Sequence, residues 1–109
     1  MADADEITRS LILKLASDPT SVLADNHATG NMLAYNLTKE DIREAICKCI
    51  KSGEQVKLTT VKTYPKAQVG QPAYAVKQVI EKQRFYIRMT IFRPETSREA
   101  LLVVSVHPD

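Results

Sequence analysis

One run of ten residues, RFYIRMTIFR from Arg84 to Arg93, constrains the fold of this chain more than any other stretch. Side chains in a β-strand alternate between the two faces of a sheet, and this run alternates apolar with polar residues. One face would carry the apolar side chains Phe85, Ile87, Met89 and Ile91. The other face would carry Tyr86, Arg88 and Thr90. We therefore expect a central strand with one packed face and one face that is available for chemistry.

The part of the chain before Gly53 has mainly helical patterns. Apolar residues at spacings of three and four predict a helix from Thr38, its N-cap, to Ser52, and Gly53 suits the position that follows its end. A shorter helix is expected over residues 7–16. Residues 20–35 are rich in turn-forming side chains, so we expect an irregular connection there, with at most a helical turn near its end.

From Glu54 onward the apolar pattern changes to a period of two, which predicts strands over residues 55–63, 73–80, 84–93 and 100–107. The short link from Glu81 to Gln83 suits a hairpin and favours an antiparallel meander. A chain of 109 residues with 44% hydrophobic content can bury one modest core. We expect a single domain over residues 1–109 of the α+β class, with two or three helices packed on one face of a four-stranded antiparallel sheet.

The same alternation identifies candidate site residues. In the first strand, Val56 and Leu58 are expected to face the core, which leaves Lys57 on the opposite face. In the last strand, the core side is expected to hold Leu102, Val104 and Val106. The opposite side is expected to hold Leu101, Val103, Ser105 and His107. The face turned away from the long helix would then collect Lys57, Tyr86, Arg88, Ser105 and His107.

Charge is distributed unevenly along the chain, although the net charge is only +2. Residues 1–56 contain six Lys and Arg against nine Asp and Glu, a net charge of −3. Residues 57–109 contain nine against four, a net charge of +5. The expected sheet is therefore the basic half, and a basic face is suited either to solvent or to a polyanion such as RNA.

The side chains expected on this face match the needs of RNA cleavage by the 2′-hydroxyl. That reaction requires a proton acceptor, cations that hold the phosphorane charge, and a proton donor for the leaving oxygen. His107 can accept or donate a proton, Lys57 and Arg88 can hold phosphate, and Tyr86 can donate a proton or stack on a base. We expect these four residues to be catalytic, with no metal and no cofactor. Further RNA contacts are expected from Lys62, Lys77, Arg84 and Ser105.

The remaining sequence features concern compartment and redox state. The first nine residues carry three acids and no basic residue before Arg9, the reverse of a secretory signal, and no apolar run approaches the ~20 residues of a membrane span. We expect a cytoplasmic protein that does not bind membranes. Cys47 and Cys49 lie two apart in the expected helix, where side chains do not face each other, so both are expected to be reduced thiols.

The order of several motifs resembles the MqsR-type mRNA interferase toxins of bacterial toxin–antitoxin systems, within the RelE-like and barnase-like ribonuclease superfamily. The motifs are LTKEDI at the helix start, then QVKLTT, YAVKQVI, FYIRMTI and LLVVSVHP in the strands, and the resemblance covers residues 37–108. It implies an endoribonuclease with an antitoxin partner. Lys57, Tyr86 and His107 occupy matching places, while Arg88 stands where the family has a Lys. The family's Trp-Gln pair has no clear counterpart in this chain, which contains no Trp.

A second resemblance is to small bacterial domains related to the BrnT-like toxins. It is carried by His27-Ala28, Met32, Asp41-Ile42, Ala45-Ile46, Gly53-Glu54 and residues 104–109. The arginine that follows the His-Ala pair in those domains is missing here. His27 precedes turn-forming residues, and we expect it to be structural, bonding to backbone near Asn26 to Asn31.

Two other functions remain open at this point. The basic face could serve a non-catalytic RNA-binding or ribosome-associated module. Alternatively, the chain could be a regulatory protein–protein interaction module with a hydrophobic docking patch of Tyr74, Leu101 and Val103. Loss of cleavage with retained RNA binding after a change at His107 would indicate an enzyme. A docking module would be indifferent to that change and to changes at phosphate contacts.

Overall fold

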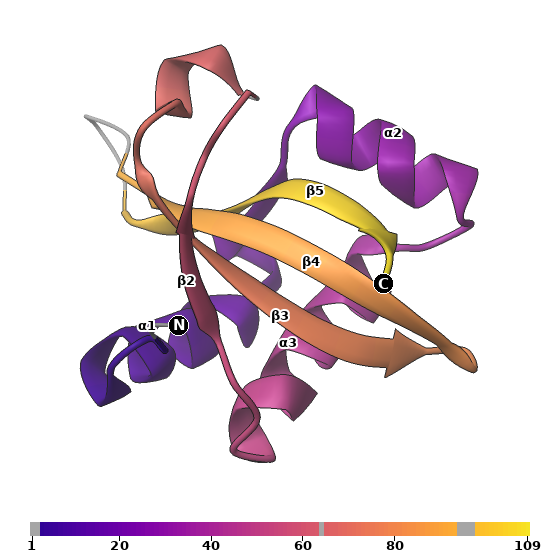
Figure 1. The fold of residues 1–109 in the computed structure, drawn as a ribbon, viewed down its shortest axis with the longest axis horizontal. Coiled ribbons are helices and arrows are strands. Elements are labelled where there is room, and N and C mark those ends of the chain that lie inside the picture. The colour runs from indigo at the N-terminus through magenta and orange to yellow at the C-terminus, as the bar shows by residue number, and fades with distance from the viewer. Residues whose placement is uncertain (1–2, 64, 94–97) are drawn as a thin grey trace.

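The structure is a computed structural model that describes residues 3–63, 65–93 and 98–109 (Figure 1). Short 3₁₀ turns occupy Pro19–Ser21 and Lys66–Gln68. The helices are α1 (Glu6–Ala16), α2 (Asn26–Ala34) and α3 (Lys39–Lys51). The strands are β1 (Val22–Ala24), β2 (Lys57–Thr60), β3 (Pro72–Ile80), β4 (Gln83–Phe92) and β5 (Ala100–Pro108).

The strands form one mixed sheet of five, in the order β1-β5-β4-β3-β2. Neighbouring strands from β2 to β5 are antiparallel, as predicted, whereas β1 pairs parallel with β5. The α+β class is therefore confirmed, but the predicted four-stranded antiparallel sheet lacked β1. A strand of three residues is too short to show a period of two, and β1 lies between turn-forming residues at Asp18-Pro19 and Asp25.

Helix α2 is the second correction, because an irregular connection was predicted where this helix forms. The Asp25 carboxylate caps it by accepting a hydrogen bond from the Ala28 N–H at 2.8 Å. Its buried positions are Ala28 and Met32, so it has almost no apolar stripe that sequence periodicity could detect. The helix packs along β5 beyond the end of β1, where the Asn31 side chain accepts a hydrogen bond from the Val106 N–H at 3.0 Å. An otherwise open strand edge is thereby covered.

Helix α3 forms where the sequence predicts it, with Thr38 as its N-cap and Ser52 as its C-cap. Thr38 and Asp41 form a reciprocal capping box at its start. The helix ends in a Schellman motif, with Gly53 at φ +74°. In this motif the Gly53 N–H donates to the Ile50 carbonyl and the Glu54 N–H donates to the Cys49 carbonyl.

Cys47 and Cys49 are free thiols. No helix within the described residues is both long and apolar enough to cross a membrane.

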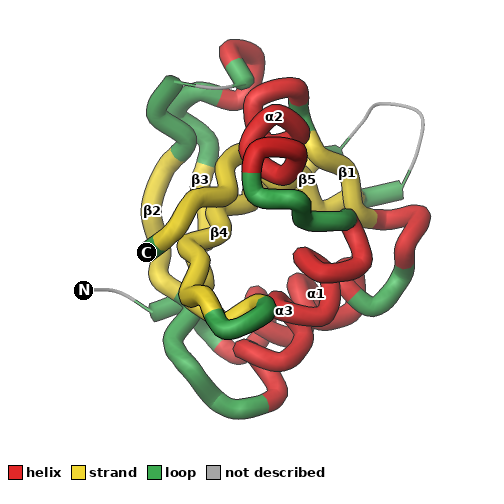
Figure 2. Tube along the Cα trace, turned by 90° about the vertical axis from the view of Figure 1, so that its right-hand side faces the viewer, coloured by secondary structure: helices red, strands yellow, loops and turns green. Residues whose placement is uncertain are grey.

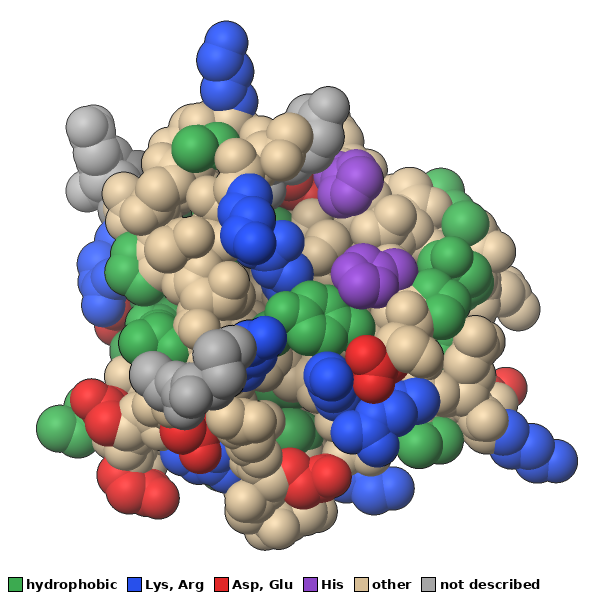
Figure 3. Space-filling view, in the orientation of Figure 1, with side chains coloured by type: hydrophobic (Ala, Val, Ile, Leu, Met, Phe, Trp, Pro, Cys, Tyr) green, Lys and Arg blue, Asp and Glu red, His purple; other side chains and the backbone are tan. Residues whose placement is uncertain are grey.

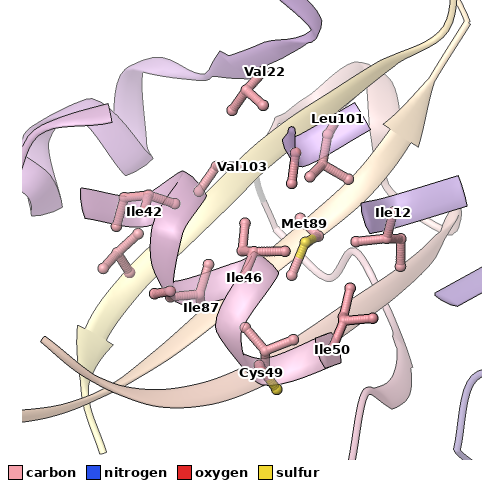
Figure 4. Close-up of a cluster of buried hydrophobic side chains, with 14 of the residues drawn as sticks. Ile12, Val22, Ile42, Ile46, Cys49, Ile50, Ile87, Met89, Leu101 and Val103 are labelled. Atoms are coloured by element: carbon pink, nitrogen blue, oxygen red, sulfur yellow. The ribbon is translucent and has the colours of Figure 1, made fainter. Parts of the chain in front are cut away.

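Helices α1 and α3 cover one face of the sheet, and α2 lies at the end where β5 and β1 run (Figure 2). The core between the layers is apolar. Ile46 of α3 and Ile87 and Met89 of β4 are fully buried and point toward one another (Figure 4). Residues from all three helices belong to the same buried cluster. The opposite face of the sheet carries no helix over β3 and β4 among the described elements (Figure 1).

A β-bulge at Val104 divides β5 into two halves with opposite parity. Arg88 pairs with Ser105 but Met89 pairs with Val103, so Val104 is an extra residue. Leu101 and Val103 consequently face the core at 0% and 1% exposure, the reverse of the prediction for this half of the strand. The prediction of a hydrophobic docking patch formed by Tyr74, Leu101 and Val103 was therefore wrong, because Leu101 and Val103 are core residues. Ser105 and His107, beyond the bulge, pair with Arg88 and Tyr86.

Candidate functional site

The candidate site lies on the face of the sheet that α1 and α3 do not cover, which we call the open face. Strand pairing arranges its side chains in two rows that run across the strands. One row runs from β3 to β5 and consists of Lys77, Tyr86 and His107. The next row runs from β2 to β5 and consists of Lys57, Ala75, Arg88 and Ser105. Both histidines of the chain lie on this face, with Lys and Arg side chains beside and below them (Figure 3).

In the first row, the Tyr86 and His107 rings are stacked. Their centroids are 5.2 Å apart and their planes are inclined by 24°. The His107 Nδ1 lies 3.2 Å from the carbonyl oxygen of Pro108. A proton on Nδ1 would be donated to that carbonyl and would leave Nε2 as the acceptor. Stacking on a strand residue limits the rotation of the imidazole, so its position relative to β4 is well defined.

In the second row, Arg88 is held across the sheet and Ser105 is deeply buried. The Nη2 of Arg88 donates a hydrogen bond to the Thr60 carbonyl at the end of β2. The Arg88 Nε and the Ser105 Oγ are buried, and neither has a hydrogen-bond partner among the described residues. A buried polar atom without a partner typically costs about 1–3 kcal/mol. Two such atoms on adjacent strands therefore mark this part of the open face as unusual.

A basic hollow of about 290 Å³ opens where β2, β3 and β4 meet. The small side chain of Ala75 leaves room at its floor, and the walls include Lys57, Lys77, Arg84 and Tyr86. Glu54 and Gln55 complete the lining. The hollow thus joins one predicted catalytic lysine, the tyrosine and two of the predicted RNA contacts.

The Asp109 carboxylate partly neutralises this basic hollow. It forms ion pairs with Arg84 at 3.1 Å and with Lys77 at 3.5 Å. Both basic side chains remain about half exposed, at 55% and 48%. Exposed ion pairs are weak, so a phosphate could compete with Asp109 for either cation.

The predicted site residues do not all converge on one point. Lys57 and His107 lie on the same face, but three strand spacings separate β2 from β5, which amounts to roughly 14 Å between backbones. Tyr86 is the link between them, because it lines the basic hollow and stacks on His107. Lys62 is exposed in the segment after β2 and lines neither of the two hollows described in this subsection.

A second hollow involves His27, which was predicted to have only a structural role. It has a volume of about 280 Å³ and lies between the start of α2, the bulge in β5 and the segment after β2. We call it the bulge hollow, and it is lined by His27, Thr63, Arg88, Val104 and Ser105. His27 is the second residue of α2 and is exposed. Its nearness to β5 depends on α2 and the bulge, both of which the sequence prediction lacked.

The chain was compared with models of protein families, with curated proteins and with solved structures, and none of these three comparisons gives a match.

Proposed function

We propose that this chain is an endoribonuclease that cleaves RNA by attack of a 2′-hydroxyl on the adjacent phosphate, with no metal in the reaction. The observation that carries the proposal is the Tyr86–His107 stack, placed beside Arg88 on an uncovered, basic sheet face. An imidazole and a phenol can supply the two proton transfers of phosphodiester cleavage, and a guanidinium can stabilise the charge on the phosphorane.

The reaction assigns each side chain a task. His107 accepts the 2′-hydroxyl proton through its free ring nitrogen while the 2′-oxygen forms a bond to phosphorus. Arg88 holds the charge that develops on the nonbridging oxygens, and Lys57 holds the neighbouring phosphate in the basic hollow. The bond to the 5′-oxygen breaks, and Tyr86 supplies the proton that this oxygen needs. The products are a 2′,3′-cyclic phosphate and a 5′-hydroxyl.

The proposal extends to the biological setting implied by the family resemblance. The chain would act in the cytoplasm as the toxin of a toxin–antitoxin pair, and RNA and an antitoxin protein would be its partners. An antitoxin that covers the open face would need acidic side chains opposite Lys57 and Lys77. Sequencing of the neighbouring reading frames tests this setting, because a toxin requires a small antitoxin encoded beside it.

The activity is tested with single-stranded RNA of mixed sequence in buffer that contains EDTA. We expect cleavage products with 2′,3′-cyclic phosphate and 5′-hydroxyl ends. His107→Ala should slow cleavage by ~10²–10⁴-fold, the usual effect of a lost general acid or base, and should leave RNA binding in place. Lys66→Gln, a change in the exposed 3₁₀ turn, is the control and should cleave at the parental rate. Full cleavage by His107→Ala would contradict the proposed mechanism.

A second candidate function is RNA binding without cleavage. It is favoured by the flat Tyr86–His107 stack with exposed cations nearby, because bases stack on such platforms in single-strand binding proteins. In this case no cyclic phosphate appears, single-stranded RNA binds more tightly than duplex DNA, and affinity falls steeply with salt. Binding that does not depend on salt, or no binding at low salt, would contradict both functions.

A further inference from the structure

The bulge hollow is built differently from the rest of the open face. Its lining contains Arg88 and His27, and no carboxylate among the residues that the structure describes. The basic hollow, in contrast, includes Glu54 and lies beside the ion-paired Asp109. The Arg88 guanidinium and the neutral or basic character of the other described lining residues therefore favour an anion in the bulge hollow.

The floor of the bulge hollow provides two donors that lack acceptors. Ser105 is 9% exposed, and its Oγ has no hydrogen-bond partner among the described residues, as is also true of the Arg88 Nε. An N–H and an O–H on adjacent paired residues can bind two oxygens of one tetrahedral anion. A compact oxyanion satisfies both donors together.

The bulge is the reason that these groups meet. The extra residue at Val104 bends β5 and turns Ser105 toward Arg88 on the open face. Helix α2 covers the same part of β5, and His27 in its first turn forms another wall of the hollow. Three distant segments, namely the start of α2, the middle of β4 and the bulge in β5, thus supply one polar group each.

We propose that the bulge hollow is a phosphate-binding subsite, with Arg88, Ser105 and His27 as its donors. Because the Arg88 Nε and the Ser105 Oγ are buried, the phosphate reaches them when the guanidinium turns from the Thr60 carbonyl. The phosphate then replaces this carbonyl as the acceptor. The volume of about 280 Å³ accommodates a phosphate with its attached sugar and is near the lower end for ligand pockets.

The subsite also determines how RNA lies on the open face, and this extension rests on the proposed function. Ser105 and His107 are two residues apart on one strand, about 7 Å along β5. A phosphate in the bulge hollow would place the adjoining nucleotide over the Tyr86–His107 stack. His27 would then contact the phosphate from the side opposite β4 and serve as a binding residue of the same reaction.

The experiment is a titration of the full chain with inorganic phosphate, followed by amide and arginine side-chain NMR signals. We expect saturable shifts at Arg88, Val104, Ser105 and His27, including the Arg88 Nε–H. Arg88→Gln should weaken binding about tenfold or more, and Ser105→Ala should weaken it severalfold. Arg93→Gln removes the same charge just beyond the end of β4 and should leave the affinity unchanged.

Each outcome of the titration either supports or overturns the phosphate-binding subsite. Shifts that spread over exposed lysines, or equal weakening by Arg88→Gln and Arg93→Gln, would overturn the subsite. If Arg88→Gln does not give a folded spectrum, Arg88→Lys keeps the charge, removes the Nε donor and should still weaken binding. Phosphate binding in the hollow without RNA cleavage supports the subsite and refutes the nuclease. Cleavage without phosphate binding in the hollow refutes only the subsite.

Discussion

Consecutive residues of β4 point to opposite faces of the sheet, and the two faces differ in burial and in polarity. On the helix side, Phe85, Ile87 and Met89 are at most 3% exposed and pack into one apolar cluster. On the open side, Tyr86 and Arg88 remain partly exposed, and the Arg88 Nε is left without a partner among the described residues. The helix side of β4 thus contributes mainly to stability, whereas the open side keeps polar groups that lower stability. A polar arrangement retained despite this cost is the expected signature of a binding or catalytic surface.

The largest expected effect comes from Val103→Asp, which would place a carboxylate on the core side of β5. Val103 lies in the half of β5 that the bulge turns toward the core, and it is 1% exposed. A buried carboxylate without a paired cation is costly, so we expect a loss of more than about 5 kcal/mol in the free energy of unfolding, a size that few single changes reach. Urea denaturation measures it, and a Val103→Asp variant of near-parental stability would show that this side chain does not face the core.

Truncation in the core face should have the next largest effect. Ile87 is fully buried, so Ile87→Ala should lower the free energy of unfolding by about 2–5 kcal/mol. Arg84→Ala, on the open side of the same strand, should change it by less than about 0.5 kcal/mol. Chemical denaturation of the two variants in parallel tests the division of tasks between the faces. Similar losses in both variants would contradict that division.

Two hydroxyl groups on the open side provide a finer test. The Thr90 Oγ1 donates a hydrogen bond to the Pro72 carbonyl at 2.7 Å, so Thr90→Val should cost about 1 kcal/mol. The Ser105 Oγ has no partner among the described residues, so Ser105→Ala should leave stability unchanged or raise it by up to about 1 kcal/mol. Thermal unfolding of the two variants measures the difference. A clear loss in Ser105→Ala would indicate a partner for this hydroxyl in solution.

The smallest expected effect is on the acid sensitivity of helix α1, which lies on the helix side of the sheet. A hydrogen bond from the Thr8 N–H lowers the pKa of the Asp5 carboxyl, which caps α1. A pKa lowered in the folded state means that this contribution is complete above the unfolded value, near ~4, and is lost as the pH falls through the folded value. Asp5→Asn keeps an acceptor at the cap, so its melting temperature should fall less than that of the parent between pH 6 and pH 3. Identical pH profiles would show that this carboxylate is not perturbed.

Long, regular patterns made the central part of the fold predictable from the sequence. The alternation in β4 gave the correct faces for Tyr86 and Arg88, and the stripe in α3 gave its buried side. The bulge escaped prediction because LLVVSV is almost entirely apolar, so one inserted residue leaves no trace in the pattern. Without the bulge and α2, the sequence could not predict that His27 shares a hollow with Arg88 and Ser105. The roles assigned to Lys57, Tyr86, Arg88 and His107 stay predictions until cleavage is measured.

Because helix α2 covers part of one edge of the sheet, only one main edge is left at which copies of the chain could pair. Beyond Val103, the helix and the Asn31 amide occupy the edge of β5, and β1 offers only three residues. At the other end, Asp3 covers β2 only at Lys57, so the rest of that strand is the accessible edge among those described. Pairing of β2 with β2 about a two-fold axis would consume this edge in both molecules. Association by sheet extension would therefore stop at a closed pair and would not propagate into filaments.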